Sequence, residues 1–186
     1  MEQLLATKFF VPSNRPELVP RPRLIERLNN DLLRKLTLIS APAGFGKTTL
    51  VIEWLESLQG TANGEKQNRV TWLSLDENDN DYARFLTYFV TALNQIEGAK
   101  NTIGDEALSL LRSPQLPPVE TILTSLINEI ATIPDRIILV LDDYHLIDSQ
   151  SVHDTLTFLL ENLPPTMHLV IFTRGNHQVH RWRQVF

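Results

Sequence analysis

The sequence predicts an α/β fold in three layers, with a mostly parallel central sheet between two layers of helices. Short apolar runs alternate with longer amphipathic stretches along the chain, as expected of strands joined by crossover helices. One run, Ile137 to Leu141, is apolar without interruption, which is typical of a strand covered on both faces of a parallel sheet. Another, Leu36 to Ser40, is followed at once by glycines and an amphipathic stretch, which indicates strand, tight loop and helix.

The composition fits one globular domain without a membrane span. The chain has 186 residues, of which 42% are hydrophobic and 21% charged, close to the usual globular mix. No apolar stretch approaches the roughly 18 residues of a membrane helix, and Met1 to Phe10 lack the order of a signal peptide. The absence of cysteine excludes disulfides and fits a reducing compartment, so we expect a cytoplasmic protein. The net charge of −5 argues against direct DNA contact by this segment.

Hydrophobic periodicity predicts the individual elements and, before them, an N-terminal arm. The arm is rich in proline and should run extended, ordered only if it docks on the rest of the chain. An acidic run at 76–81 should form a loop that ends in a helix cap, and a polar segment at 60–67 should be a surface loop. The periodicity predicts strands at 36–40, 70–75, 137–141 and 168–172, and helices at 23–33, 48–58, 82–96, 105–111, 119–133 and 152–163.

The glycine-containing turn after the first strand has the residues needed to hold nucleotide phosphates. Its two glycines let successive backbone amides face inward, with the helix N-terminus behind them. Lys47 would reach the β and γ phosphates, the Thr48 hydroxyl would bind Mg²⁺, and Thr49 would touch the α phosphate. The segment therefore predicts a P-loop site for ATP or ADP with Mg²⁺, and reads Ala41, Pro42, Ala43, Gly44, Phe45, Gly46, Lys47, Thr48, Thr49.

The first position of this loop departs from the general pattern, which has glycine where this chain has Ala41. An alanine there must avoid positive φ. The alternative interpretation is a glycine turn with an incidental lysine. The strand before the loop and the helix after it argue against that alternative.

Carboxylates follow the central strand, and an arginine follows the last one. Asp142 comes directly after Leu141, the order in which a strand delivers a carboxylate to the Mg²⁺ of a P-loop site, and Asp143 would orient or deprotonate the attacking water. Arg174 ends the last strand, at the edge where α/β folds bind ligands, and is a candidate γ-phosphate sensor. Taken alone, two aspartates after an apolar strand more often mark a strand that meets its polar loop, and Arg174 would equally suit a solvated strand end. The phosphate loop upstream favours the functional interpretation of the aspartates. The five histidines show no metal-ligand spacing, and we expect no chemical role for them.

The chain resembles the STAND-class ATPase domain of MalT-like, LuxR-type transcriptional regulators, over residues 4 to 174. The resemblance rests on motifs spread along the whole chain, and the family's own loop has alanine at its first position. The motifs are Lys8-Phe9-Phe10-Val11-Pro12, Leu18-Val19-Pro20-Arg21-Pro22-Arg23-Leu24, the phosphate loop, Trp72-Leu73-Ser74-Leu75-Asp76, Asp79-Asn80-Asp81, Phe85, Leu141-Asp142-Asp143-Tyr144-His145 and Thr173-Arg174.

The resemblance implies a nucleotide switch of the ASCE/STAND type. Val19, Pro20 and Arg21 would lie over the adenine and ribose, and Arg174 would read the γ phosphate. In the family, ATP and a small inducer convert a monomer into an oligomer that acts on DNA, and slow hydrolysis resets it. We accordingly divide the chain into an arm and short helix packed on the nucleotide site (1–35), a P-loop core (36–176) and a tail (177–186).

The family's sheet normally has one more strand, followed by helical, winged-helix, sensor and helix-turn-helix domains. We therefore expect this chain to be a fragment or a truncated product. Two alternatives stay open at this point: an ATPase core attached to a kinase or assembly scaffold instead of a DNA-binding domain, and a P-loop used only as an interaction scaffold that does not hydrolyse ATP.

Overall fold

The computed structural model describes residues 3–13, 19–59, 68–96 and 103–174, so the predicted loop at 60–67 and the predicted tail at 177–186 lie outside the described residues. Within these ranges the strands form one parallel sheet in the order β1-β4-β3-β2. The predicted fold class is confirmed. The strands are β1 (Leu36–Ser40), β2 (Asn68–Ser74), β3 (Arg136–Asp142) and β4 (Met167–Thr173).

The register of the parallel strands brings their carboxyl ends to one edge of the sheet. Ser40 at the end of β1 pairs with Thr173 of β4, and Ser74 of β2 pairs with Asp142 of β3. β3 and β4 are the two inner strands. The β3 side chains from Ile137 to Leu141 are fully buried. The polar residues that follow each strand therefore share one edge, as ligand-binding residues do in open α/β sheets.

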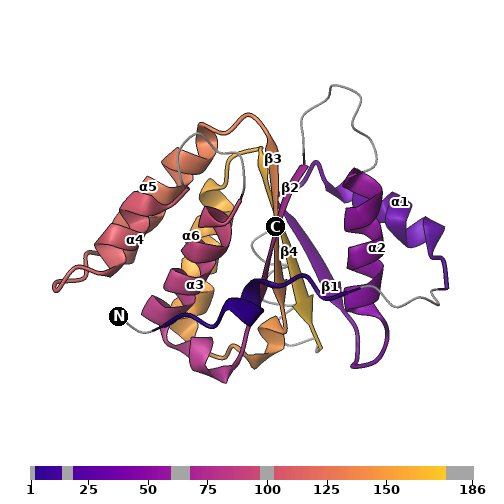
Figure 1. Cartoon of the computed structure of the whole chain (residues 1–186), viewed down its shortest axis with the longest axis horizontal. Coiled ribbons are helices and arrows are strands. Elements are labelled where there is room, and N and C mark those ends of the chain that lie inside the picture. The colour runs from indigo at the N-terminus through magenta and orange to yellow at the C-terminus, as the bar shows by residue number, and fades with distance from the viewer. Residues whose placement is uncertain (1–2, 14–18, 60–67, 97–102, 175–186) are drawn as a thin grey trace.

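Helices cover both faces of the sheet and complete the three layers (Figure 1). α1 (Pro22–Asp31) and α2 (Lys47–Gln59) cover one face, where Trp54 and Trp72 are buried in a compact apolar cluster. The larger cluster lies on the other face, between the sheet and four helices. These are α3 (Tyr82–Asn94), α4 (Asp105–Leu111), α5 (Val119–Ala131) and α6 (Gln150–Asn162).

Local capping explains where α3 begins. The Asp81 carboxylate accepts a hydrogen bond of 2.8 Å from the Arg84 backbone N–H, which satisfies an otherwise unpaired donor at the helix N-terminus. The predicted helix cap is thus confirmed, but the predicted loop before it is wrong in part. Residues Glu77–Asn80 form a 3-10 turn, η2, with a reciprocal capping box between Asp76 and Asp79.

The prediction of an extended N-terminal arm also needs correction. Residues Ala6–Phe9 form a 3-10 turn, η1, and Lys8 within it is buried. This turn depends on contacts with η2 and α3, which periodicity along the arm does not reveal. Within the described ranges, the chain has no helix that is both long enough and apolar enough to cross a membrane.

Candidate functional site

A cleft of about 760 Å³ lies at the carboxyl edge of the sheet, between the loop after β1 and the ends of β3 and β4. It brings together the predicted phosphate, metal and catalytic groups, with two residues of the N-terminal arm as an additional wall. The lining residues are Pro12, Ser13, Ala43, Gly44, Gly46, Lys47, Thr48, Thr49, Ile52, Asp142, Asp143 and Arg174.

The phosphate loop has the backbone shape that its sequence predicts. Gly44 and Gly46 adopt positive φ values of 82° and 71°, a conformation that is strained for residues with a Cβ atom. Among the described residues, the non-glycine with positive φ is Asp143, so Ala41 avoids that region as expected. The Lys47 ammonium donates hydrogen bonds to the carbonyls of Ala41 (2.6 Å) and Pro42 (3.1 Å), which holds the charge at the loop.

The two aspartates at the end of β3 occupy different environments. Asp142 is the last residue of the strand, and its Oδ1 accepts a 2.8 Å hydrogen bond from the Asp143 N–H. Asp143 follows in the left-handed region with a φ of 56°, which aspartate tolerates better than most residues. Its carboxylate pairs with Arg174 at 3.2 Å. The predicted catalytic pair is thus in contact, and its charges lie on the cleft wall.

The Asp142 carboxyl has a raised pKa. Burial is the main cause, and the adjacent Asp143 charge adds to it, raising the pKa from 3.8 to about 6. A carboxylate that is desolvated and faces a like charge would be stabilised by a cation. With the Thr48 hydroxyl on the same cleft, it provides the oxygen ligands that Mg²⁺ prefers.

His145 lies in this region although the sequence interpretation gave it no role. It is on the 3-10 turn η3 (Tyr144–Leu146), with its Nδ1 3.7 Å from the Asp143 carboxylate. That nitrogen is buried, and it makes no hydrogen bond within the part of the chain that the structure describes. Burial, with the nearby Arg174 charge, lowers the pKa of the imidazole. Metal-ligand spacing does not point to His145, whereas its position two residues after Asp143 in the sequence does.

The residues predicted to contact the base lie beside this cleft rather than in it. Arg21 Nη1 donates a 3.1 Å hydrogen bond to the Phe45 carbonyl, and together they border an adjoining cleft of about 580 Å³ between α1, β1 and the loop. Lys47 lines both clefts. Val19 and Phe45 present exposed apolar side chains, and Pro20 lines a third, shallower hollow with Arg21.

The fold and the cleft define the class of the molecule: an α/β nucleotide-binding domain of the P-loop type. Comparison with known families agrees, since residues 17–172 match the AAA ATPase domain. The chain therefore belongs to the AAA ATPase domain family.

Its relatives extend the resemblance to MalT. The chain is 33% identical over 176 residues to the HTH-type transcriptional regulator MalT of Klebsiella pneumoniae, covering 95% of this chain. It is 32% identical over 171 residues to the MalT of Vibrio parahaemolyticus and 33% over 171 to that of Yersinia pestis, each covering 92% of this chain. The chain spans 18% of the length of each of these relatives. The chain is thus an AAA ATPase domain that resembles one part of MalT.

Proposed function

We propose that this chain is the ATP-binding and slowly hydrolysing switch module of a signal-responsive, MalT-like regulator. One observation carries the proposal: a single cleft joins the phosphate loop, the carboxylates of Asp142 and Asp143, and Arg174. Each group has the chemistry that phosphoryl transfer requires, namely amides and a lysine for the phosphates, oxygen ligands for Mg²⁺ and a carboxylate for water.

The roles within the cleft follow from the contacts. Backbone amides from Ala43 to Gly46 would surround the phosphates, and Thr49 would contact the α phosphate. Lys47 would exchange its two carbonyl partners for β and γ phosphate oxygens. Thr48 and Asp142 would hold Mg²⁺, which neutralises phosphate charge during transfer.

The ion pair between Arg174 and Asp143 suggests how the catalytic carboxylate is released. Both side chains are about half exposed, at 49% and 40%, so the pair is weakly held. A γ phosphate would compete for Arg174 and leave Asp143 free to accept a proton from the attacking water. The water oxygen would then bond to the γ phosphorus, and ADP would leave with the electrons of the broken P–O bond.

Val19, Pro20, Arg21 and Phe45 would contact the base and ribose. Arg21 and Phe45 border the cleft that Lys47 also lines, and Pro20 lines a neighbouring hollow with Arg21. Val19 is exposed and precedes Pro20 in the sequence. The proposal places the module in the cytoplasm, as part of a longer regulator. There, inducer binding, self-association and DNA binding would involve segments outside this chain. The MalT relatives are HTH-type transcriptional regulators by name, which supports the expectation of DNA binding.

The test is the affinity for ATP with and without Mg²⁺, measured by calorimetry on the wild type and Lys47→Ala. We expect Lys47→Ala to weaken binding about tenfold or more, since a charge-assisted contact to phosphate is lost. Lys35→Ala is the matched control, because that lysine bonds the Glu161 carbonyl (2.7 Å) and does not line the cleft. Equal affinity of wild type and Lys47→Ala would overturn the proposal in favour of an interaction scaffold.

A further inference from the structure

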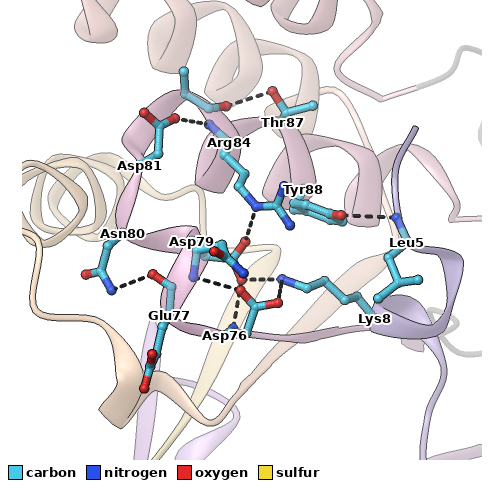
Figure 2. A network of polar contacts seen from close by, with 12 residues as sticks. Leu5, Lys8, Asp76, Glu77, Asp79, Asn80, Asp81, Arg84, Thr87 and Tyr88 are labelled. Atoms are coloured by element: carbon cyan, nitrogen blue, oxygen red, sulfur yellow. Dashed lines mark hydrogen bonds and ion pairs between the residues drawn. The ribbon is translucent and has the colours of Figure 1, made fainter. Parts of the chain in front are cut away.

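The N-terminal arm is attached to the core by a buried ionic network (Figure 2). Lys8 of η1 is only 5% exposed, and its ammonium pairs with Asp79, which is fully buried, and with Asp76 at 2.9 Å. The Asp79 carboxylate also accepts hydrogen bonds from the Asp76 N–H at 2.8 Å and from Arg84 Nε at 3.3 Å. Two cations and two carboxylates thus meet at the start of α3.

Tyr88 of α3 adds apolar and polar contacts to the same arm residues. The Lys8 ammonium lies 4.5 Å from the centre of the Tyr88 ring, a cation–π geometry. The Phe9 ring packs on Tyr88 with a centroid separation of 5.8 Å, and the Tyr88 hydroxyl accepts a 3.0 Å hydrogen bond from the Leu5 N–H. We call Leu5, Lys8 and Phe9, with Asp76, Asp79, Arg84 and Tyr88, the arm latch.

The chemistry of the arm latch favours one docked position. A buried lysine is unfavourable unless its charge is matched by well-placed partners, and here Asp79 and Asp76 provide them. Sliding the arm by one residue would bury Thr7 or Phe9 in place of Lys8 and leave Asp79 with less compensation. A buried ion pair is weak evidence for added stability, and its best-attested use is to fix the register of packed elements.

The arm latch is close in sequence to a wall of the phosphate cleft. Figure 1 shows the arm crossing the front of the sheet from α3 toward the α1 side. Pro12 and Ser13, four and five residues after Lys8, line the same cleft as the phosphate loop, Asp143 and Arg174. The span from Lys8 to Ser13 is short, at most about 17 Å when fully extended, so an anchored Lys8 restricts where Ser13 can lie.

We propose that Lys8 is a positioning residue for nucleotide retention: the arm latch holds Pro12 and Ser13 as a wall over the phosphate cleft and so slows nucleotide release. This inference rests on the proposed function, since it assigns a wall to that same cleft. Lys8 and Asp79 would then help to set the residence time of the nucleotide, although they do not line the cleft.

The test is the dissociation rate of a fluorescent ADP analogue, chased with excess ADP, from the full chain and its variants. Lys8→Met keeps the length of the side chain but removes the charge. We expect nucleotide release to be about tenfold faster, because the state with the arm docked beside the cleft becomes a minor population. Phe9→Ala weakens the same docking without leaving a buried carboxylate unpaired. It serves if Lys8→Met fails to fold, and it should also accelerate release.

Arg69→Met is the matched control. Arg69 pairs with Asp135 at 2.5 Å, at the opposite end of β2 from η2, so its loss should lower stability and leave the release rate unchanged. Release from Lys8→Met and Phe9→Ala at the wild-type rate would overturn the arm latch while leaving nucleotide binding intact. No binding by the wild type would instead refute the proposed function. Equal acceleration by Arg69→Met would show general destabilisation and also overturn the inference.

Discussion

At the scale of single residues, the site depends on two adjacent aspartates that the backbone holds differently. Asp142 ends a buried strand, whereas Asp143 turns into the left-handed region with a φ of 56° and reaches Arg174. Residues in this region cluster at functional sites, where the surrounding structure enforces them. The desolvated carboxylate of Asp142 is therefore suited to binding a cation, and the more exposed carboxylate of Asp143 is suited to accepting a proton from water.

Replacing Asp143 with asparagine should separate hydrolysis from binding. Asparagine tolerates the left-handed conformation but cannot accept the proton of the attacking water. We expect ATP affinity to be retained and the hydrolysis rate to fall about 10²- to 10⁴-fold, measured by phosphate release at saturating ATP. The exposed Asp148 offers a control substitution, Asp148→Asn. An unfolded Asp143→Asn chain that binds nothing would show instead that this carboxylate is structural.

The raised pKa of Asp142 predicts a specific dependence of stability on pH. Between about pH 4 and 6 the folded chain keeps a proton on Asp142 that the unfolded chain has released, so this residue's contribution to stability falls as the pH rises. The difference between 3.8 and about 6 corresponds to at most about 3 kcal/mol at pH 7.

Asp142→Asn removes this titration. Without Mg²⁺ or nucleotide, the free energy of unfolding of the variant, relative to that of the wild type, should increase as the pH rises from 4 to 7. Urea titrations at a series of pH values measure the difference. A difference that stays constant with pH would show that the Asp142 carboxyl is not destabilised by its surroundings.

At the scale of elements, the strands and helices with strong periodicity could be predicted, and the short turns could not. The stripe from Phe85 to Leu93 is buried as its spacing indicates, because one apolar face specifies a helix regardless of its partners. Turn η1 is different, since it is held by contacts such as that of Lys8 with Asp79, which join residues distant in sequence. Turn η2 has a local capping box between Asp76 and Asp79, but it is too short for periodicity to reveal it. The position of His145 beside Asp143 could likewise not be predicted, because it depends on where η3 places the ring.

The close packing of Gly104, at the start of α4, leads us to expect a large effect from one added methyl group. Gly104, just before α4, has a φ of 86°, and a Cβ atom there would lie 2.3 Å from Val90 Cγ1. We expect Gly104→Ala to cost about 2 to 4 kcal/mol of stability, from backbone strain together with overpacking. Gly44→Ala is the comparison, because its φ is 82° but its surroundings are open, so it should cost only about 1 to 2 kcal/mol.

Urea denaturation of both glycine variants measures this difference. Val90→Ala in the Gly104→Ala background should recover part of the loss, since it removes the methyl group that the new Cβ meets. Equal costs at the two glycines would show that α4 can move away from α3 and that their packing does not hold it.

At the scale of the whole molecule, the parallel register is what assembles the site. Ser40 and Thr173 are paired at the ends of β1 and β4, and Asp142 ends β3, which pairs with β4 on its other side. The phosphate loop, the carboxylates and Arg174 therefore converge although they are far apart in sequence. Sequence motifs could predict this convergence because parallel strands share a carboxyl edge. The family resemblance also implied an arm packed on the nucleotide site, but the motifs could not predict that Pro12 and Ser13 line the cleft or which contacts make up the arm latch.

The most direct measurement is a crystal structure of this chain with Mg²⁺ and a non-hydrolysable ATP analogue. We expect Lys47 to leave the carbonyls of Ala41 and Pro42 for the β and γ phosphates and Arg174 to contact the γ phosphate. Thr48 and Asp142 should ligate Mg²⁺, with the adenine beside Val19 and Arg21. A nucleotide bound elsewhere, or Lys47 still bonded to its carbonyls beside a bound nucleotide, would contradict the account.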